Sequence, residues 1–234
     1  MRVPWLLWLV CLQTARSIRP LGQMRFIITQ GKTFPSAEAS LVITLPNDCK
    51  CKMRCLVSVD CVAWSSLPSS NDTVECRLTE LGPQEGTLID QNDAVYGFKP
   101  SRLKSRITVF EGEDGLIYFI PLEDLRYEGA KKYCASIPGF RLAIFKTKQQ
   151  FQIGVDVGQN GGRGAFVDLR RTKTGEVVWG DGTILPTSHY PFVAQISKVH
   201  FTKFQIWTES LDIIVNESLQ RKLLCQGNDG YNWW

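Results

Sequence analysis

The chain has 234 residues, of which 44% are hydrophobic, 21% charged and 11% aromatic. This composition is typical of a folded globular protein and excludes a disordered, collagenous or multi-spanning membrane chain. The 27 basic and 23 acidic residues nearly balance, which argues against nucleic acid as a partner, because nucleic-acid binding needs a concentrated basic surface.

The first 17 residues have the pattern of a secretory signal peptide. Arg2 precedes an apolar run over residues 5–12, and Ala15 and Ser17 are the small residues expected before a cleavage site. The run is too short to cross a bilayer, which disfavours the alternative of an N-terminal membrane anchor. We therefore expect residues 1–17 to be removed and the protein to be secreted into the extracellular space, with no membrane span.

The cysteines predict a disulfide framework, because secretion permits disulfides. Five are crowded between residues 49 and 76, and two are far apart, at Cys134 and Cys225. Between the groups, residues 99–106 contain four basic residues and a proline without apolar periodicity, as expected of an exposed linker. The sequence thus predicts two domains, over residues 22–99 and 107–234, joined by a basic linker over residues 100–106.

The first half has the pattern of one short helix and several strands. The helix is expected over residues 51–59, because Cys51 and Cys55 lie one turn apart on the same face. The strands are expected at residues 24–28, 40–44, 62–65, 75–78 and 94–98. A helix on a small antiparallel sheet, held by disulfides, suits a domain of this size.

The spacing of these cysteines resembles the PAN/apple family. Cys51 opens the helix, Cys55 follows one turn later, Cys61 precedes a Val-Ala-Trp-Ser strand and Cys76 precedes Arg-Leu. The resemblance implies the pairs Cys51–Cys76 and Cys55–Cys61 and a binding module for proteins or carbohydrates. Cys49 is left over, and three alternatives stay open: a disulfide-linked dimer, replacement of Cys51 in its pair, or a buried free thiol.

The second half alternates strands with two helices. The first helix is expected over residues 123–136, with Tyr127, Ala130 and Cys134 on one face. Thr147 and Gln150 form a capping-box pattern that opens the second helix. The strands are expected at residues 115–120, 142–145, 165–169, 176–179 and 222–225, with a long irregular stretch before the last one.

This order resembles the C-type lectin-like domain over about residues 110–230. The run Phe-Val-Asp-Leu at 166–169 stands in place of the family's Trp-Ile-Gly-Leu, and Trp-Gly-Asp-Gly follows at 179–182. The resemblance implies an α+β fold with two helices, two small sheets, a long irregular loop and a Cys134–Cys225 disulfide. Two departures stand out: Asp168 replaces a glycine, and the family's second cysteine pair is missing.

The calcium ligands that the family uses to bind sugars are absent from the sequence. The family supplies a Glu-Pro-Asn or Gln-Pro-Asp triplet and a Trp-Asn-Asp triplet, whereas Pro186 and Pro191 have no neighbouring carboxylate or amide and no Trp-Asn-Asp precedes Cys225. Asp181 is interpreted as a turn residue between glycines. We expect no sugar-reading calcium site and no other cofactor.

Catalytic motifs are also absent. Neither His189 nor His200 has metal-ligand spacing, and there is no nucleophile elbow or phosphate loop. We therefore expect no enzyme activity. His189 with Tyr190 and Phe192 is a candidate ligand contact, and the alternative is a cluster packed within its own loop. Lys131 and Lys132 are interpreted as solvated side chains.

These observations predict a secreted, non-catalytic recognition protein of the kind used in innate immunity. Its ligand would be a glycan or a microbial surface, and the alternative is a protein-binding or adhesion module without carbohydrate activity. Asn71 and Asn216 begin Asn-x-Ser/Thr triplets and are expected to carry glycans.

Overall fold

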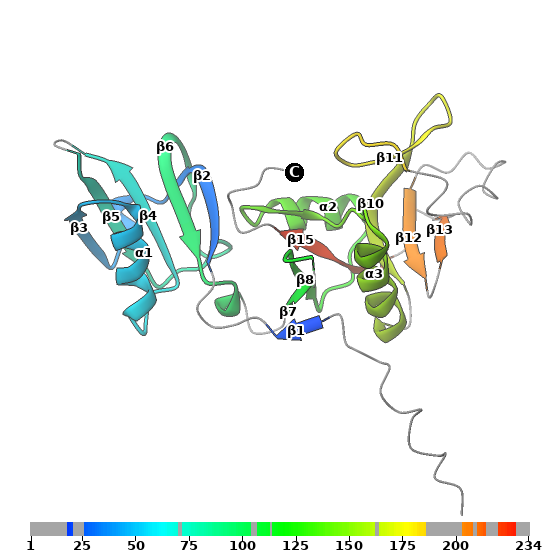
Figure 1. Ribbon diagram of the computed structural model, residues 1–234, viewed down its shortest axis with the longest axis horizontal. Coiled ribbons are helices and arrows are strands. Elements are labelled where there is room, and N and C mark those ends of the chain that lie inside the picture. The colour runs from blue at the N-terminus through cyan, green and yellow to red at the C-terminus, as the bar shows by residue number, and fades with distance from the viewer. Residues whose placement is uncertain are drawn as a thin grey trace, which may run out of the picture.

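The computed structural model describes residues 18–20, 26–69, 72–103, 107–112, 114–161, 164–185, 203–207, 210–213 and 220–227. These residues form three five-stranded sheets and three α-helices in an α+β fold (Figure 1). One sheet lies in the first part of the chain, and the other two lie beside it in the second part. No helix among the described residues is long and apolar enough to cross a membrane.

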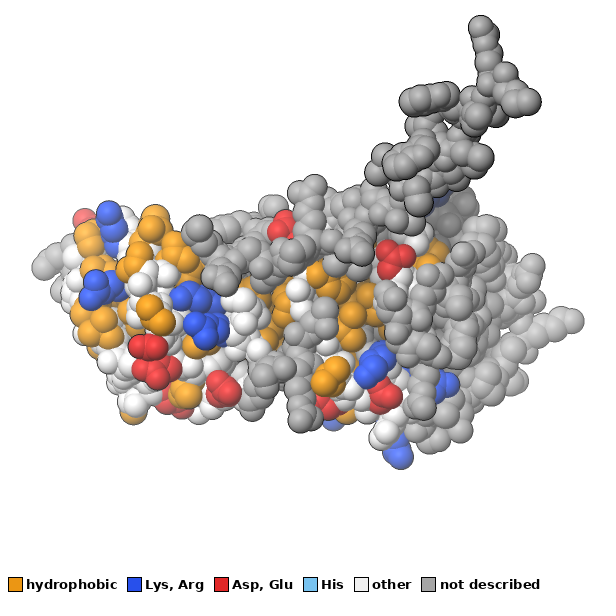
Figure 2. Space-filling model, turned by 90° about the horizontal axis from the view of Figure 1, so that it is seen from below, with side chains coloured by type: hydrophobic (Ala, Val, Ile, Leu, Met, Phe, Trp, Pro, Cys, Tyr) orange, Lys and Arg blue, Asp and Glu red, His pale blue; other side chains and the backbone are white. Residues whose placement is uncertain are grey.

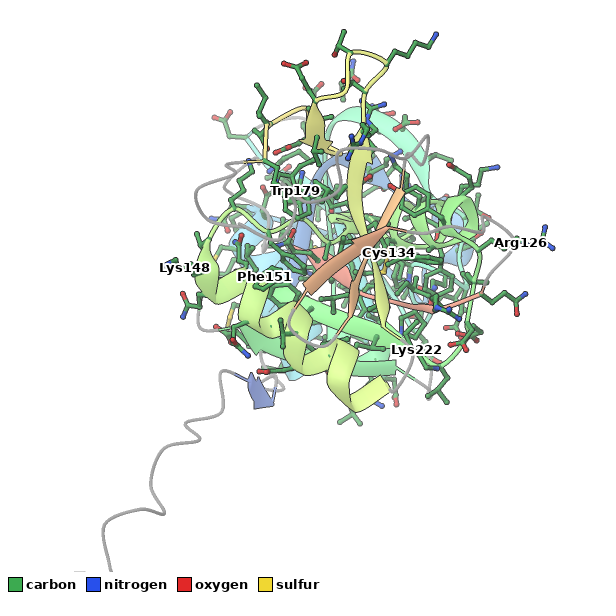
Figure 3. The ribbon with its side chains drawn as sticks, turned by 90° about the vertical axis from the view of Figure 1, so that its right-hand side faces the viewer. Arg126, Cys134, Lys148, Phe151, Trp179 and Lys222 are labelled. Atoms are coloured by element: carbon green, nitrogen blue, oxygen red, sulfur yellow. A yellow bond between two sulfur atoms is a disulfide. The ribbon has the colours of Figure 1, made fainter. Side chains whose placement is uncertain are left out.

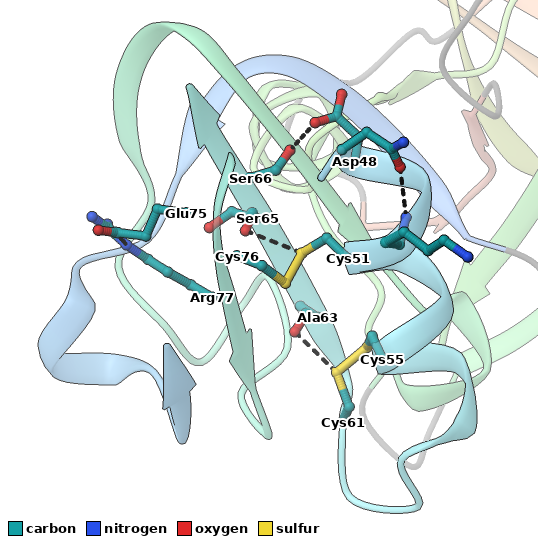
Figure 4. Close-up of a disulfide and its surroundings, with 12 residues drawn as sticks. Asp48, Cys51, Cys55, Cys61, Ala63, Ser65, Ser66, Glu75, Cys76 and Arg77 are labelled. Atoms are coloured by element: carbon teal, nitrogen blue, oxygen red, sulfur yellow. Dashed lines mark hydrogen bonds and ion pairs between the residues drawn. A yellow bond between two sulfur atoms is a disulfide. The ribbon is translucent and has the colours of Figure 1, made fainter. Parts of the chain in front are cut away.

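The first sheet is antiparallel and carries α1 (Asp48–Val57) on one face (Figure 4). Its strands, in the order β2-β6-β4-β5-β3, are β2 (Ile27–Thr33), β6 (Ile89–Phe98), β4 (Ala63–Pro68), β5 (Val74–Thr79) and β3 (Leu41–Leu45). The short 3-10 helix η1 (Ser36–Glu38) precedes β3. The disulfides Cys51–Cys76 and Cys55–Cys61 are the pairs that the PAN/apple resemblance implies.

Helix α1 begins three residues before the expected position because Asn47 caps it. The side chain of Asn47 accepts a hydrogen bond from the Lys50 amide at 3.0 Å, which satisfies a backbone donor that the helix itself leaves open. Cys51 is buried and bonded to the sheet, whereas Cys49 is exposed and carries no disulfide. The alternatives in which Cys49 replaces Cys51 or is a buried thiol therefore disagree with the structure.

The second sheet is antiparallel and combines strands of the second part with β1 from the N-terminal end of the chain. Its strands, in the order β1-β7-β8-β15-β9, are β1 (Ile18–Pro20), β7 (Ile107–Gly112), β8 (Ile117–Pro121), β15 (Cys225–Gly227) and β9 (Phe140–Leu142). A disulfide joins Cys134 of α2 (Tyr127–Ala135) to Cys225 of β15. It therefore connects residues that are 91 positions apart.

The third sheet lies beside α3 (Lys148–Gly161) (Figure 3). The strands β11 (Val177–Trp179), β10 (Ala165–Arg171), β12 (Lys203–Trp207) and β13 (Ser210–Ile213) are neighbours in that order. The short β14 (Lys222–Leu223) pairs with β10 in parallel, and every other pair in this sheet is antiparallel.

Helix α2 is shorter than expected, starting at Tyr127 instead of residue 123. The preceding segment is held extended, because Leu125 and Arg221 exchange backbone hydrogen bonds at 3.1 and 3.0 Å. The Asp124 carboxylate is also ion-paired with Lys222 at 3.1 Å. A partner far along the chain thus overrides the acidic residues that would favour a helix start.

The basic segment expected to be an exposed linker is packed along its described portion. Pro100–Arg102 form the 3-10 helix η2, and Leu103 is buried. One hydrophobic cluster contains residues from both parts of the chain, including Phe34 and Phe98 from the first part and Phe119 and Phe140 from the second. The rings of Phe98 and Phe140 lie 6.5 Å apart, so the two parts share a core next to this segment.

Candidate functional site

The turn after β11 is the described part of the chain next to the expected ligand-contact segment. Trp179 and Thr183 close this turn through a backbone hydrogen bond of 2.8 Å. Trp179 itself is buried and packs edge-on against Phe145, with ring centroids 5.8 Å apart (Figure 3). The turn is therefore anchored in the core.

Asp168 of β10 is buried beneath this turn and has two partners on α2. The Tyr127 hydroxyl donates to its Oδ1 at 3.1 Å, and the Lys131 ammonium lies 3.1 Å from the same oxygen. Tyr127 and Lys131 are one helical turn apart, so both side chains reach the same point. Burial, followed by the Asp168 charge, raises the pKa of Tyr127, and the hydroxyl therefore remains a donor.

Gly180 is required by the position of the Asp168 carboxylate. The backbone amide of Gly180 donates to the Asp168 carbonyl at 2.7 Å, which holds the two chain segments together. A Cβ atom at position 180 would overlap the Asp168 carboxylate oxygen Oδ2. The glycine at position 180 in Trp-Gly-Asp-Gly is therefore matched to the aspartate at position 168.

Asp181, in the turn itself, is the second paired carboxylate. It lies 2.7 Å from the Lys146 ammonium and accepts hydrogen bonds from the Thr183 amide at 3.0 Å and the Thr183 hydroxyl at 2.7 Å. Burial by itself would raise the pKa of Asp181, but the bonds from Lys146 and Thr183 outweigh burial and lower it to about 2. Asp181 is therefore ionised at neutral pH.

We call Tyr127, Lys131, Lys146, Asp168 and Asp181 the polar cluster. The half-buried Arg141 lies within electrostatic range of both aspartates: burial lowers its pKa, and Asp181 and Asp168 raise it. Within the polar cluster, Asp168 is ion-paired with Lys131 and Asp181 with Lys146.

This arrangement holds a turn in place but offers little to a metal ion. Calcium needs six to eight oxygen ligands, and both carboxylates of the polar cluster are already bonded to ammonium groups. In the described parts of the chain, no three His, Cys, Asp or Glu side chains gather at a point where they could hold a metal ion.

The candidate residues from the sequence fall into two groups. The six cysteines of the implied disulfides are paired as the resemblances imply. The ligand-contact candidates His189, Tyr190 and Phe192 and the glycosylation candidates Asn71 and Asn216 lie outside the described residues.

Lys131, interpreted as a solvated side chain, keeps 40% of its side chain exposed and is also ion-paired with the buried Asp168. The sequence held one signal for this pair: a charged residue in a strand that is otherwise apolar, and a lysine four residues after Tyr127 on α2. Nothing in the sequence connected these two positions, which are 37 residues apart.

Comparisons with known proteins find no matching family model and no matching curated protein. Solved structures do resemble part of the chain. They include the natural killer cell receptor Ly49C, at 11% identity over 47% of this chain and 84% of that chain, with a TM-score of 0.39.

Two further similar structures cover about the same share of the chain. The Kupffer cell C-type lectin receptor Clec4f, in a trimeric structure, is 16% identical over 50% of this chain and 82% of that chain, with a TM-score of 0.40. CEL-IV is 11% identical over 53% of this chain and 92% of that chain, with a TM-score of 0.42. At these scores the similarities assign neither a family nor a ligand to this chain.

Proposed function

We propose that the chain is a secreted, non-catalytic recognition protein that binds a glycan or microbial-surface ligand without calcium. In this proposal residues 1–17 are a signal peptide, residues 22–99 a PAN/apple-like domain and residues 107–234 a C-type lectin-like domain. The strand β1, which follows the proposed cleavage site, pairs with β7, so the residues directly after that site belong to the folded protein.

The observation that carries the proposal is the pairing of both aspartates of the polar cluster with lysines. A calcium-dependent sugar site needs several carboxylate and amide oxygens free to coordinate the ion. Here the two aspartates of the polar cluster are bonded to the ammonium groups of Lys131 and Lys146. The element order α2, α3, β10, β11 and the disulfide from α2 to β15 support the lectin-like assignment.

The ligand contacts in this proposal are His189, Tyr190 and Phe192, which follow the anchored turn. Aromatic rings stack on the apolar faces of sugar rings and do not need a metal ion to do so.

A glycan array with the secreted protein, in calcium and in excess chelator, tests the proposal. We expect the same glycans to be bound in both conditions and to be lost in the His189→Ala/Tyr190→Ala/Phe192→Ala variant. Lys173→Ala/Thr174→Ala, in the exposed β10–β11 turn, is the control and keeps binding. Calcium affinity in the micromolar range, with glycan binding abolished by chelator, would contradict the proposal.

A protein ligand is the second candidate, because apolar side chains are exposed at the end of α1. Met53, Val57 and Val59 are 46%, 69% and 78% exposed. Val57 lines a cavity of about 340 Å³, and Val57 and Val59 line one of about 680 Å³ whose charged lining residues, Lys99 and Arg102, are both basic. Figure 2 shows hydrophobic side chains interspersed with both basic and acidic ones over the left-hand part of the molecule. An array that binds no glycan in either condition would favour this candidate.

A further inference from the structure

The strand β3 forms an outer edge of the first sheet. It pairs with β5 on one side, and no described strand pairs with it on the other. Figure 1 shows β3 at the end of the molecule that lies farthest from the second part. Because alternate residues of an antiparallel strand direct their N–H and C=O groups to opposite sides, β3 presents a row of backbone donors and acceptors at this end.

The sequence of β3 lacks the features that normally protect an edge. Natural edge strands carry lysines, prolines or bulges that prevent pairing with another strand. The five residues of β3 are Leu-Val-Ile-Thr-Leu, with no charge, proline or glycine, and the register with β5 is continuous over all five. This edge is therefore suited to accept a further strand.

The two faces of β3 differ in their surroundings. Ile43 is paired in register with Cys76, which is bonded to α1, so Leu41, Ile43 and Leu45 lie on the α1 side and are half-buried. On the other side Val42 is 44% exposed and Thr44 is also exposed. Every side chain of β3 thus keeps surface that a neighbouring strand would cover.

The residue order of β3 is complementary to itself when two copies run antiparallel about Ile43. Leu41 then faces the second copy's Leu45, the two Ile43 side chains face each other, and Val42 faces the second copy's Thr44. The α1 side gains only apolar pairs, and the opposite side gains pairs of β-branched residues, which stabilise sheets. No two like charges meet in the strand pair.

We propose that β3 is an interface for a second copy of this chain. The two β3 strands pair antiparallel about Ile43 and join the two five-stranded sheets into one continuous sheet across a twofold axis. Such an interface is isologous, since each copy contributes the same surface. A five-residue strand pair buries little surface, so the dimer is weak and depends on protein concentration.

This dimer does not use the exposed Cys49. The two Leu45 residues lie about 13 Å apart along the paired strands, because four residues separate them in register at 3.3 Å each. Cys49 follows Leu45 at the same end of the strand, so the pairing does not bring the two thiols together. Strand pairing and a Cys49 disulfide are therefore separable in solution.

The test introduces charges at positions 42 and 44, which lie opposite each other in the dimer. In Val42→Lys/Thr44→Lys, lysines face lysines across the axis and repel. In Val42→Glu/Thr44→Lys, each glutamate faces a lysine. The second variant also introduces no like-charge pair within one chain. On β5, Arg77 is the partner of position 42 and Glu75 is the partner of position 44. Both of these side chains point away from α1 (Figure 4).

Sedimentation equilibrium of the mature chain over a range of concentrations measures dimerisation of the wild type, both variants and Cys49→Ser. We expect dimers of the wild type and of Cys49→Ser with the same affinity, and dimers of Val42→Glu/Thr44→Lys. The Val42→Lys/Thr44→Lys variant should dimerise about tenfold more weakly, from two like-charge pairs. Thermal unfolding shows whether both variants keep the fold.

Amide hydrogen exchange gives an independent readout that does not rely on mutation. Exchange of the β3 amides in the wild type should slow as the concentration is raised, while exchange in β2, the opposite edge, should not change. A wild type that stays monomeric at the highest concentration would overturn the proposal, as would equal dimerisation of the two charge variants. A dimer lost in Cys49→Ser would overturn it in favour of a disulfide-linked pair.

Discussion

At the scale of single residues, the paired aspartates are the feature that distinguishes the second part of this protein. Asp168 and Asp181 are each bonded to a lysine and to hydroxyl donors. Their negative charges therefore stabilise the turn that precedes residues 186–202. The same residue types, left unpaired, would have been candidates for a cation site.

The first prediction concerns acid stability. Because the pKa of Asp181 is lowered to about 2 in the folded chain, from 3.8, its contribution is fully present above pH 4 and is lost as the pH falls toward 2. Lys146→Met should remove much of this contribution, at a cost of about 0.5–1 kcal/mol at neutral pH for a partly exposed ion pair. Thermal unfolding between pH 2 and 7 measures both effects.

Lys148→Met is the matched control for this pair, since Lys148 is exposed and points outward (Figure 3). Its unfolding temperature should follow the wild type across the whole pH range. If the unfolding temperatures of Lys146→Met and Lys148→Met change with pH in the same way, the ion pair of Asp181 with Lys146 does not stabilise the turn.

At the scale of secondary-structure elements, the C-terminal end of α1 is capped by Lys99, the residue that directly follows β6. Lys99 follows β6, is 7% exposed, and donates through its ammonium to the carbonyls of Cys55 and Ser58 at 3.0 and 3.2 Å. These carbonyls are acceptors that the helix itself leaves open at its C-terminal end. Lys99 also places a positive charge where the helix dipole is negative.

The second prediction is that Lys99→Met lowers the free energy of unfolding by about 1–2 kcal/mol, because it removes two charge-assisted hydrogen bonds. Lys50→Met is the control: it removes an exposed lysine from the first turn of the same helix, where a positive charge opposes the dipole. Urea denaturation measures the free energy of unfolding of both variants. Equal losses of this free energy would show that the loss of a positive charge, and not the capping of α1, is responsible.

The pH dependence of Lys99 has the same direction as that of Asp181, since both pKa values are lowered in the folded chain and stability then rises with pH. Burial, followed by the charge of Arg102, lowers the pKa of Lys99. The unfolded chain therefore holds this proton more tightly than the folded chain does. The free energy of unfolding accordingly rises as the pH increases from the folded to the unfolded pKa of Lys99. This dependence should be absent from Lys99→Met.

At the scale of the whole molecule, the two parts of the chain share a hydrophobic core. The cluster that contains Phe98 includes residues of the first sheet, of α2 and of β8, β9 and β15. Another cluster, which contains Phe26, is made only of residues from the first part. The two clusters provide a way to separate the stability of the first part from the contact between the parts.

The third prediction is that Phe98→Ala speeds amide exchange in β8 and β9 of the second part, whereas Phe26→Ala does so much less. Both substitutions remove a buried ring, at a cost of about 3–5 kcal/mol, but only Phe98 contacts the second part, through Phe140 at 6.5 Å. Hydrogen exchange with mass spectrometry reads each strand separately. Equal effects of the two variants on β8 would contradict a contact that acts through Phe98.

The sequence by itself determined the features that depend on neighbouring residues. The one-turn spacing of Cys51 and Cys55 located α1, the capping-box pattern at Thr147 and Gln150 located α3, and β-rich runs located most strands. The α+β class followed from the two family resemblances that these elements and the cysteines carry. The strands β1, β7, β12 and β13 were not among the expected strands, although Ile-Thr-Val-Phe in β7 and Phe-Gln-Ile in β12 are strand-type patterns.

Only the tertiary structure decided the contacts between residues far apart in the chain. The pair Lys131–Asp168, the contact of Lys99 with the end of α1, and the core shared by Phe98 and Phe140 each join segments with no common local signal. Their physical cause is burial: a charge or ring removed from water must meet a partner brought close by the fold. Periodicity shows which side chains are buried, whereas the packing of the elements decides what each of them meets.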